Sequence, residues 1–243
     1  MTNDENLLYN FYTTERNGEM MRDGGGAFGF DIHHALEIDY LIRNYRCDSI
    51  IETGTHFGDT TCFFAKNYPH LKIITCEINR EFYNKSKRRL SKYNNVEVVY
   101  NSSEKVIDKY LPSLDFPLIY LDAHWEDYWP LQDEIKNITH GIVCVGDFNI
   151  KHMDYGFDSY NDVDCDLSFL REHLSTTNRY DCPSKIYCNN PNSVYRFPLM
   201  ANQSWGVHHR LGGRAYYFEG IDMTGKIDFE AVLDKGANFS IAK

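Results

Sequence analysis

Residues 50–61 read IIETGTHFGDTT, and this stretch decides the fold. A short apolar run leads into a turn with Gly54 and Gly58, and a helical pattern begins after the second glycine. A strand, a glycine-bearing turn and a helix in this order are typical of ligand-binding loops in open α/β sheets. We expect Gly54 to let the backbone approach a ligand, and Gly58 to allow the tight turn into the helix.

The same alternation continues on both sides of this stretch. Buried strands are predicted at 49–53, 71–76, 96–100, 117–121 and 142–145, with helices at 31–44, 60–67, 79–92, 102–111 and 130–139. Because the strands lack polar alternation, a parallel sheet covered on both faces is predicted. Two further strands at 186–188 and 215–218 complete a Rossmann-like, doubly wound, mostly parallel α/β sheet of about seven strands.

The ends of the chain carry weaker signals. Residues 1–30 are polar with scattered aromatics and end in a glycine-rich run, so they are expected to form an N-terminal arm or lid. Residues 31–243 are expected to form a single domain. Within it, 149–161 is predicted to be a long loop, 163–174 a helix and 189–213 an irregular stretch.

Composition excludes several classes of protein. The 243 residues are 42% hydrophobic, with no apolar run long enough for a membrane span and no signal-peptide pattern at the start. The seven cysteines are odd in number and form no C-x-x-C motif, which predicts reduced, buried thiols and a cytoplasmic protein. The net charge of −10 argues against nucleic acid as a partner. The basic run at 85–89 is expected to be a solvated helix face. The aromatic N-terminal arm could pack on a second copy of the chain as easily as on its own domain, so a homo-oligomer stays open.

The second predicted strand ends at Glu77, 23 residues after Gly54. An acid at this spacing is placed to accept hydrogen bonds from ribose hydroxyls, although an acid at a strand end can also be merely solvated. The two features in register favour an adenosine-bearing cofactor. A dinucleotide fits less well, because the third glycine is missing and Asp59 would repel a pyrophosphate while suiting a cationic ligand.

Together these residues resemble a class I S-adenosylmethionine-dependent methyltransferase over about residues 48–147. The resemblance implies S-adenosylmethionine as cofactor. It places the cofactor against the glycine loop, the acid and the ends of the third and fourth strands. The cofactor-binding residues that it implies are Glu52, Gly54, Thr55, Gly58, Asp59, Thr60, Glu77, Ile78, Ser102, Ser103 and Asp122.

A second polar motif, YLDAHW at residues 120–125, follows the fourth predicted strand, and Asp147 follows the fifth. Polar groups at the end of a buried strand are costly unless they are used. If the two strands are neighbours, Asp122 and Asp147 would chelate one divalent cation through carboxylate oxygens.

This motif, followed by WPL at residues 129–131, resembles the macrocin-type and cephalosporin-cluster-type O-methyltransferases. The resemblance implies Asp122 as a magnesium ligand and His124 as the general base. An unshifted pKa near 6.5 would leave the imidazole neutral at pH 7, as a base requires; the alternative is a structural histidine bonded to Asp122. The family's acid pair is broken by Gly146, so the need for magnesium stays open, with Asn149 or water as replacement ligands.

Aromatic side chains near these motifs suggest a sugar or sugar-derived acceptor, because aromatic faces stack on sugar rings. The predicted substrate-binding residues are Trp125, Tyr128, Trp129, Tyr155 and His34. His34 has an alternative as part of a polar helix start. His208 and His209, with Trp205, are weaker candidates.

Two other functions are compatible with these residues. A nicotinamide-dependent dehydrogenase would share the strand–glycine–helix unit. A non-catalytic domain that keeps the cofactor pocket would explain Gly146. The preferred reading is an O-methyltransferase acting on a small-molecule or saccharide hydroxyl, with no nucleic acid or membrane partner.

Overall fold

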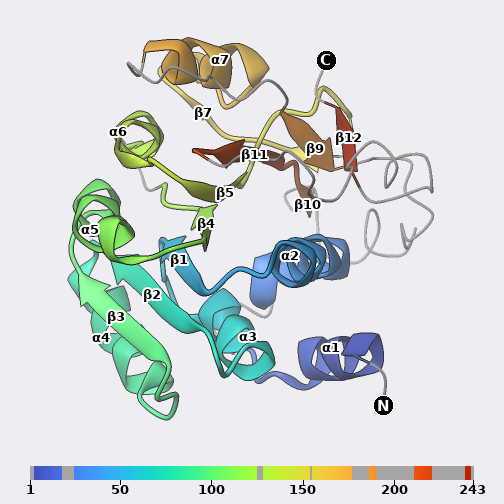
Figure 1. The fold of residues 1–243 in the computed structure, drawn as a ribbon, viewed down its shortest axis with the longest axis vertical. Helices are drawn as coiled ribbons and strands as arrows, with labels where there is room; N and C mark the ends of the chain where they lie inside the picture. The colour runs from blue at the N-terminus through green and yellow to red at the C-terminus, as the bar shows by residue number, and fades with distance from the viewer. Residues whose placement is uncertain are drawn as a thin grey trace.

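A twisted sheet of eight strands runs through the molecule in the order β12-β9-β11-β5-β4-β1-β2-β3 (Figure 1). The structure is a computed structural model, and it describes residues 3–17, 25–124, 128–153, 155–176, 186–189, 211–220 and 239–241. The five parallel strands are β1 (Ser49–Thr53), β2 (Lys72–Glu77), β3 (Val96–Tyr100), β4 (Pro117–Leu121) and β5 (Gly141–Val145).

Three antiparallel strands extend the sheet beyond β5. They are β11 (Ala215–Glu219), β9 (Tyr187–Asn189) and β12 (Phe239–Ile241). The predicted Rossmann-like, mostly parallel sheet is confirmed, with one strand more than the seven expected. The extra strand is β12, whose three residues gave no signal in the sequence.

The chain reverses direction across the sheet between β1 and β4. From β1 it moves outward to β2 and β3, and then returns to β4 on the other side of β1. The carboxyl ends of β1 and β4 therefore border the switch point, where ligands bind in sheets of this kind. The glycine loop and residues 120–124 of the YLDAHW motif lie at these two strand ends.

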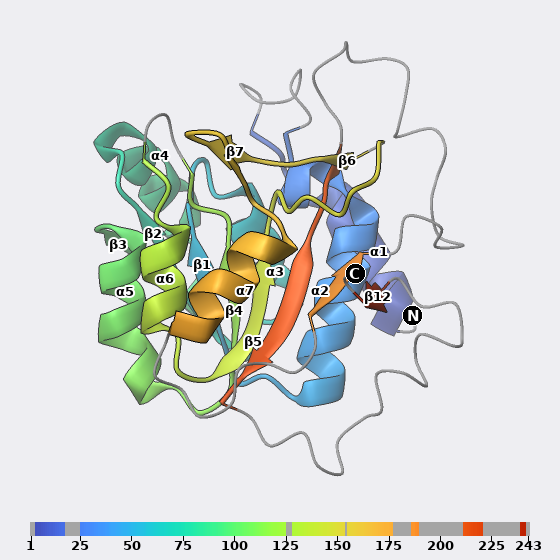
Figure 2. The same cartoon turned by 90° about the horizontal axis from the view of Figure 1, so that it is seen from above.

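Helices cover both faces of the sheet (Figures 1 and 2). One core joins the sheet to α1 (Asn3–Thr13), α2 (Ile32–Tyr45) and α3 (Asp59–Asn67). The other joins it to α5 (Ser103–Tyr110), α6 (Leu131–Asn137) and α7 (Leu167–Thr176). Side chains alternate along each strand, so Ile50 belongs to the first core and Ile51 to the second. Helix α4 (Arg80–Leu90) packs on β2 and β3, and the 3₁₀ turns are η2 (Ala27–Phe30) and η3 (Leu111–Ser113).

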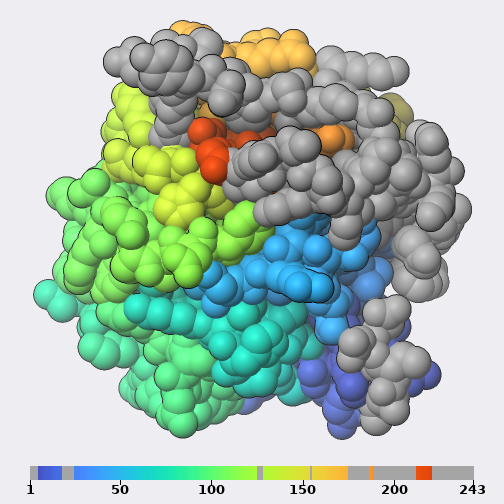
Figure 3. All heavy atoms as spheres, viewed as in Figure 1, coloured from blue at the N-terminus to red at the C-terminus, as the bar shows by residue number. Residues whose placement is uncertain are grey.

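The N-terminal segment contains a helix that the sequence analysis did not predict. Leu7 and Phe11 of α1 are 1% and 3% exposed and belong to the first core. In Figure 3 the dark blue spheres of α1 lie at the bottom and the orange spheres of α7 at the top. The division into an arm at 1–30 and a domain at 31–243 stays a prediction.

The region after β5 differs from the prediction. The expected helix at 163–174 is wrong at its start, because Val163 lies in a short strand, β8 (Val163–Asp164). Helix α7 begins at Leu167, where the carboxylate of Asp166 accepts the N–H groups of Ser168 (2.9 Å) and Phe169 (3.2 Å) as a cap. The expected loop contains β6 (Tyr155–Gly156) and β7 (Ser159–Tyr160), and β6 pairs with β10 (Leu211–Gly212).

Six of the seven cysteines are described, and all six are buried thiols outside any disulfide, as expected. Cys182, Trp205, His208 and His209 lie outside the described residues. Among the helices that are described, none has the length and apolar character needed to cross a bilayer.

Candidate functional site

The loop after β1 folds against the ends of β2 and β4. The N–H groups of Gly54 and Thr55 both donate to the carbonyl oxygen of Cys76, at 3.1 and 2.9 Å. Gly54 has a φ of 80°, and a Cβ there would lie 2.7 Å from the carbonyl oxygen of Asp122. The chain itself therefore requires glycine at this position, whatever ligand approaches. Gly58, with a φ of 78°, precedes α3 as the predicted tight turn.

Glu77 points its carboxylate back towards this loop. Oε2 accepts the N–H of His56 at 2.8 Å, and Oε1 accepts the N–H of Asn79 at 2.8 Å. A carboxylate has about four lone-pair sites, so it can accept further bonds from ligand hydroxyls. The next residue, Ile78, is 52% exposed and offers an apolar surface beside the acid. The role of Glu77 as a ribose-binding acid stays a prediction.

Other residues of the predicted cofactor set brace the loop from inside the protein. Glu52 is 1% exposed and accepts a short hydrogen bond from the hydroxyl of Thr61. Burial raises the pKa of Glu52 to about 8, against the hydrogen bonds to its carboxylate. The hydroxyls of Thr55 and Thr75 are 2.6 Å apart and buried. These side chains hold the loop conformation and face away from solvent.

The start of α3 holds the N-terminal segment and α4. The carboxylate of Asp59 lies 2.6 Å from the Arg89 guanidinium and accepts the N–H of Asn17 at 3.1 Å. The hydroxyl of Thr60 accepts the N–H of Phe28 at 3.1 Å. Since Arg89 compensates the charge of Asp59, repulsion of a pyrophosphate is a weaker argument than the sequence suggested. Arg89 belongs to the basic run that was predicted to be solvated, but its guanidinium pairs with Asp59.

At the start of α5, Ser102 and Ser103 have different surroundings. The hydroxyl of Ser102 donates to Glu104 at 2.6 Å and is partly exposed. Ser103 is 5% exposed. Ser102 is thus the more accessible of these two predicted cofactor-binding residues.

The ends of β4 and β5 bring together the predicted catalytic and metal-binding residues. One ligand atom each from Asp122, His124 and Asp147 lies within 4.8 Å of the others. His124 Nε2 is 3.8 Å from Asp147 Oδ2, and the two side chains are 36% and 35% exposed. The predicted neighbourhood of Asp122 and Asp147 is confirmed by the pairing of β4 with β5.

A fourth residue, Asp158, completes this group. Its Oδ2 lies 3.0 Å from His124 Nδ1. The backbone N–H of Asp158 donates to the carbonyl oxygen of Asp147 at 2.9 Å, which fixes the segment beside the cluster. The nearest carboxylate partner of the imidazole is therefore Asp158, rather than Asp122 as in the structural alternative.

The crowded carboxylates shift the protonation of the cluster. Burial and the charge of Asp147 raise the pKa of Asp122 to about 7. Burial lowers the pKa of His124, but the hydrogen bond to Asp158 and the charges of the three carboxylates outweigh it and raise this pKa to about 9. The imidazole is then protonated at pH 7, whereas the sequence argument for a base used the unshifted value.

Two glycines leave the space that the carboxylates of Asp122 and Asp147 occupy. A Cβ at Gly146 would lie 2.5 Å from Asp122 Oδ1, and one at Gly212 would lie 2.2 Å from Asp147 Oδ1. Both contacts are closer than any real Cβ tolerates. The glycine that breaks the family's acid pair is therefore required by the position of the Asp122 carboxylate.

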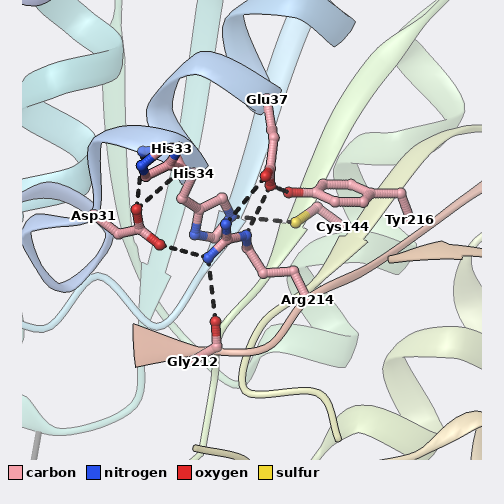
Figure 4. A network of polar contacts seen from close by, with 8 residues as sticks. All are labelled: Asp31, His33, His34, Glu37, Cys144, Gly212, Arg214 and Tyr216. Carbon is pink, nitrogen blue, oxygen red and sulfur yellow. Dashed lines mark hydrogen bonds and ion pairs between the residues drawn. The ribbon is translucent and has the colours of Figure 1, made fainter. Parts of the chain in front are cut away.

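A buried ion network connects α2 to the segment that carries Gly212 (Figure 4). The guanidinium of Arg214 lies 2.6 Å from Asp31 and 2.8 Å from Glu37, and donates to the carbonyl oxygen of Gly212 at 3.2 Å. The hydroxyl of Tyr216 donates to Glu37 at 2.5 Å. This network holds Gly212 in place against the cluster.

The four predicted substrate-binding residues that the structure describes do not share one surface. His34 is 4% exposed, with Nε2 3.5 Å from the Cys144 sulfur, and burial holds its pKa well below the usual value. Trp129 stacks on Tyr160 and Phe169, with ring centroids 5.1 and 4.5 Å away.

Of the other three substrate-binding residues, Tyr155 is 8% exposed and Tyr128 is 45% exposed. Trp125 lies outside the described residues. Tyr128 is therefore the member of the predicted set with a freely accessible ring in the part that is described.

Sequence reasoning missed Asp158, His56 and Arg214. Asp158 lies in a segment with several aspartates, and no spacing distinguishes it from its neighbours. His56 stands inside the glycine loop with a φ of 49°, a conformation that is uncommon outside glycine. Arg214 follows two glycines in a stretch without regular pattern. Their contacts become visible only in the folded chain.

Comparison with known proteins bears on the fold. No protein-family model matches the chain, and no curated protein sequence matches it either. Among solved structures, a Staphylococcus aureus protein described as a "putative caffeoyl-CoA O-methyltransferase" has a TM-score of 0.50 at 14% identity, covering 90% of this chain and 100% of that one.

Two further structures have TM-scores below that value. A SAM-dependent methyltransferase from Aquifex aeolicus gives 0.48 at 12% identity, covering 90% of this chain and 98% of that one. The O-methyltransferase TomG from Streptomyces achromogenes, solved with SAM, gives 0.46 at 17% identity, covering 78% and 80%. At such identities a likeness informs on architecture alone, and the chain has the fold of the class I S-adenosylmethionine-dependent methyltransferases.

Proposed function

We propose that this chain is an S-adenosylmethionine-dependent O-methyltransferase. The observation that carries the proposal is the pairing of two sites at one sheet edge. A glycine loop and the fixed carboxylate of Glu77 border the switch point on one side. The Asp122–His124–Asp147 cluster follows the neighbouring strands on the other. A donor site beside an acceptor site is what group transfer requires.

The donor side suits an adenosine-bearing cofactor. Glu77 would accept hydrogen bonds from the ribose hydroxyls, and Ile78 would pack against the apolar base. Ser102 at the start of α5 is accessible for a further polar contact. The missing third glycine disfavours a dinucleotide. Repulsion of a pyrophosphate by Asp59 counts less, because Arg89 compensates the charge of that carboxylate.

The acceptor side orients a hydroxyl for an in-line displacement. The oxygen forms a bond to the methyl carbon as the carbon–sulfur bond breaks, and the hydroxyl proton leaves. Alignment of this kind can contribute up to about 7–11 kcal/mol to catalysis. In the prediction from the sequence, His124 is the general base that accepts this hydroxyl proton. Because that imidazole is protonated at pH 7 in this arrangement, it would first have to lose its own proton.

The donor set of the cluster fits a divalent cation. Burial raises the pKa values of both Asp122 and Asp147, and the charge of Asp147 adds to the shift of Asp122 as that of Asp158 adds to the shift of Asp147. A cation would compensate these neighbouring negative charges. When bound, the ion would polarise the acceptor hydroxyl and lower its pKa. The residues that would hold it are Asp122 and Asp147, as the sequence predicts.

We propose a sugar or other small polyhydroxylated molecule as acceptor. The support is the exposed ring of Tyr128 beside acidic side chains that can accept hydrogen bonds from hydroxyls. Fewer aromatic rings are available to a sugar than the sequence suggested, because Trp129 already stacks on Tyr160 and Phe169. The net charge of −10 argues against a nucleic-acid acceptor.

Thermal melting with S-adenosylhomocysteine, with NADH as comparator, tests the cofactor. Ligand at about 100 times its dissociation constant adds about 2.7 kcal/mol, or roughly 5–10 °C in Tm for a chain of this size. We expect this shift with S-adenosylhomocysteine and not with NADH. Glu77→Gln should abolish it. The control Glu81→Gln, an exposed acid on α4, should keep it.

Transfer of labelled methyl groups to a panel of sugars and polyols tests the reaction. Labelled acceptor would support the proposal. A shift with NADH but not with S-adenosylhomocysteine would overturn it in favour of a dehydrogenase. Cofactor binding without transfer to any acceptor in the panel would favour the non-catalytic alternative.

A further inference from the structure

We propose that His124 is the third protein ligand of a metal ion held by Asp122 and Asp147, that Asp158 orients its ring, and that the site prefers a first-row transition metal to magnesium. This role replaces the base role that the sequence gives to His124, because Nε2 cannot bind an ion and accept a proton with the same lone pair. It rests on the proposed function for what the ion does, but ion binding can be measured without turnover.

The distances fit a single ion. Ligand atoms bonded to one ion at about 2.1 Å lie roughly 3–4 Å from each other. The three side chains already offer atoms within 4.8 Å of one another, and His124 Nε2 lies 3.8 Å from Asp147 Oδ2. Small side-chain adjustments would bring all three atoms into coordination.

The orientation of the imidazole points to a ligand role. Nδ1 lies 3.0 Å from the Asp158 carboxylate and donates its hydrogen there. The lone pair of a neutral ring is then on Nε2, which faces Asp147. Metal-binding histidines commonly donate the other ring N–H to a carboxylate in this way. Asp158 is the carboxylate in this position, and its backbone N–H donates a hydrogen bond to the carbonyl oxygen of Asp147.

The glycine at 146 explains why the third ligand comes from 124. Any side chain at 146 would begin 2.5 Å from Asp122 Oδ1, so an acid cannot stand there while Asp122 keeps its position. His124 reaches the cluster from the end of β4 instead. The site thereby exchanges a carboxylate for an imidazole.

This exchange changes which ion the site prefers. Magnesium takes hard oxygen ligands, whereas imidazole suits first-row transition metals. With one nitrogen and two carboxylates, we expect Mn²⁺ and Co²⁺ to bind more tightly than Mg²⁺. We therefore assign a divalent transition metal to the site.

Direct metal titration of the full chain tests the assignment. After dialysis against chelator, Mn²⁺ is titrated and its free concentration followed by electron paramagnetic resonance, with Mg²⁺ as competitor. We expect one Mn²⁺ per chain, bound at least tenfold more tightly than Mg²⁺. His124→Ala should weaken Mn²⁺ binding at least tenfold and change Mg²⁺ binding much less.

Asp158→Asn provides a second variant that keeps all three ligands. Loss of its carboxylate should weaken Mn²⁺ about 10–100-fold, as expected for a residue that orients a ligand. His70→Ala, an exposed histidine elsewhere on the chain, is the matched control and should bind Mn²⁺ like the original protein. Circular dichroism establishes that each variant is folded.

Three results would overturn the inference: no Mn²⁺ binding, equal affinity for Mn²⁺ and Mg²⁺, or unchanged Mn²⁺ affinity in both His124→Ala and Asp158→Asn. These outcomes are independent of the cofactor test. A shift with S-adenosylhomocysteine without Mn²⁺ binding would leave the proposed function standing and reject this inference. If Mn²⁺ binding depends on His124 but S-adenosylhomocysteine does not shift Tm, the metal site stands and the proposed function is rejected.

Discussion

Gly146 and the Asp122 carboxylate occupy adjoining space at the end of β5, and this contact makes a prediction at the scale of one residue. Gly146→Ala places a Cβ 2.5 Å from Asp122 Oδ1, so Asp122 must move. We expect a loss of about 1–3 kcal/mol in the free energy of unfolding and at least tenfold weaker Mn²⁺ binding. Urea unfolding and metal titration measure the two effects.

The control for this variant is Gly29→Ala. A Cβ at Gly29 meets nothing within 4 Å, but its φ of 62° makes alanine unfavourable by roughly 1–2 kcal/mol. Both variants should lose stability, and only Gly146→Ala should lose Mn²⁺ affinity. Equal Mn²⁺ affinity in the two would show that Asp122 tolerates the new side chain.

Glu52 gives a prediction about pH. Burial raises its pKa from 4.5 to about 8. The folded chain therefore keeps a proton that the unfolded chain loses above pH 4.5, so this residue lowers the free energy of unfolding as pH rises towards 8. Glu52→Gln should make the decline less steep by up to about 1.4 kcal/mol per pH unit between pH 5 and 8.

Urea unfolding at several pH values, without ligand, measures this slope. Glu81→Gln serves as control, because its side chain is 73% exposed and should leave the slope as it is. Parallel curves for Glu52→Gln and the original protein would mean that Glu52 is ionised in the folded chain.

At the scale of single elements, the start of α2 combines a cap with an ion pair. Asp31 accepts the N–H of His33 at 2.9 Å, and its other oxygen lies 2.6 Å from the buried Arg214. Asp31→Asn keeps an oxygen for the cap but leaves the cation less compensated. We expect a loss of about 3–5 kcal/mol, as for a broken buried pair.

Asp166→Asn is the matched change at the start of α7. Asp166 also caps its helix, but its ion pair is with Lys151, whose side chain is 61% exposed, so the loss should stay below about 1 kcal/mol. Urea unfolding compares the two variants. Equal losses would mean that the Arg214 pair adds nothing beyond the cap.

The elements also show where sequence patterns suffice. The bounds of β1, β3 and β4 match the prediction, because buried parallel strands are continuous apolar runs that stop at glycine or polar residues. Helix α4 starts at Arg80, one residue after the predicted start, and the Asn79 side chain caps it. The start of α7 was missed, because Val163 continued the apolar pattern while the cap at Asp166 decided the boundary.

The candidate site was predictable where it follows strand ends, and less so elsewhere. The sequence predicts that Asp122 and Asp147 come together if their two strands are neighbours, and the pairing of β4 with β5 meets this condition. Asp158 and Arg214 come from the irregular part of the chain, and their roles depend on tertiary contacts. The raised pKa of His124 likewise depends on Asp158, which no local pattern could reveal.

At the scale of the whole molecule, the question is whether the N-terminal segment belongs to the cooperative unit. Phe11 is 3% exposed, and its ring lies 6.0 Å from that of Phe63 in α3 and stacks on Phe30 at 5.1 Å. A separate arm would not bury a ring in the first core. We expect Phe11→Ala to lower the free energy of unfolding by about 3–5 kcal/mol.

Two probes that report on different parts of the molecule test this prediction. Far-UV circular dichroism reports on all helices, and tryptophan fluorescence includes Trp129, which packs on the second core. If the chain is one cooperative unit, Phe11→Ala shifts both urea transitions together. Tyr9→Ala, on the same helix but 58% exposed, should change stability by less than about 0.5 kcal/mol. A shift of the circular dichroism transition alone would mean that α1 unfolds separately, because the second core would then survive its loss.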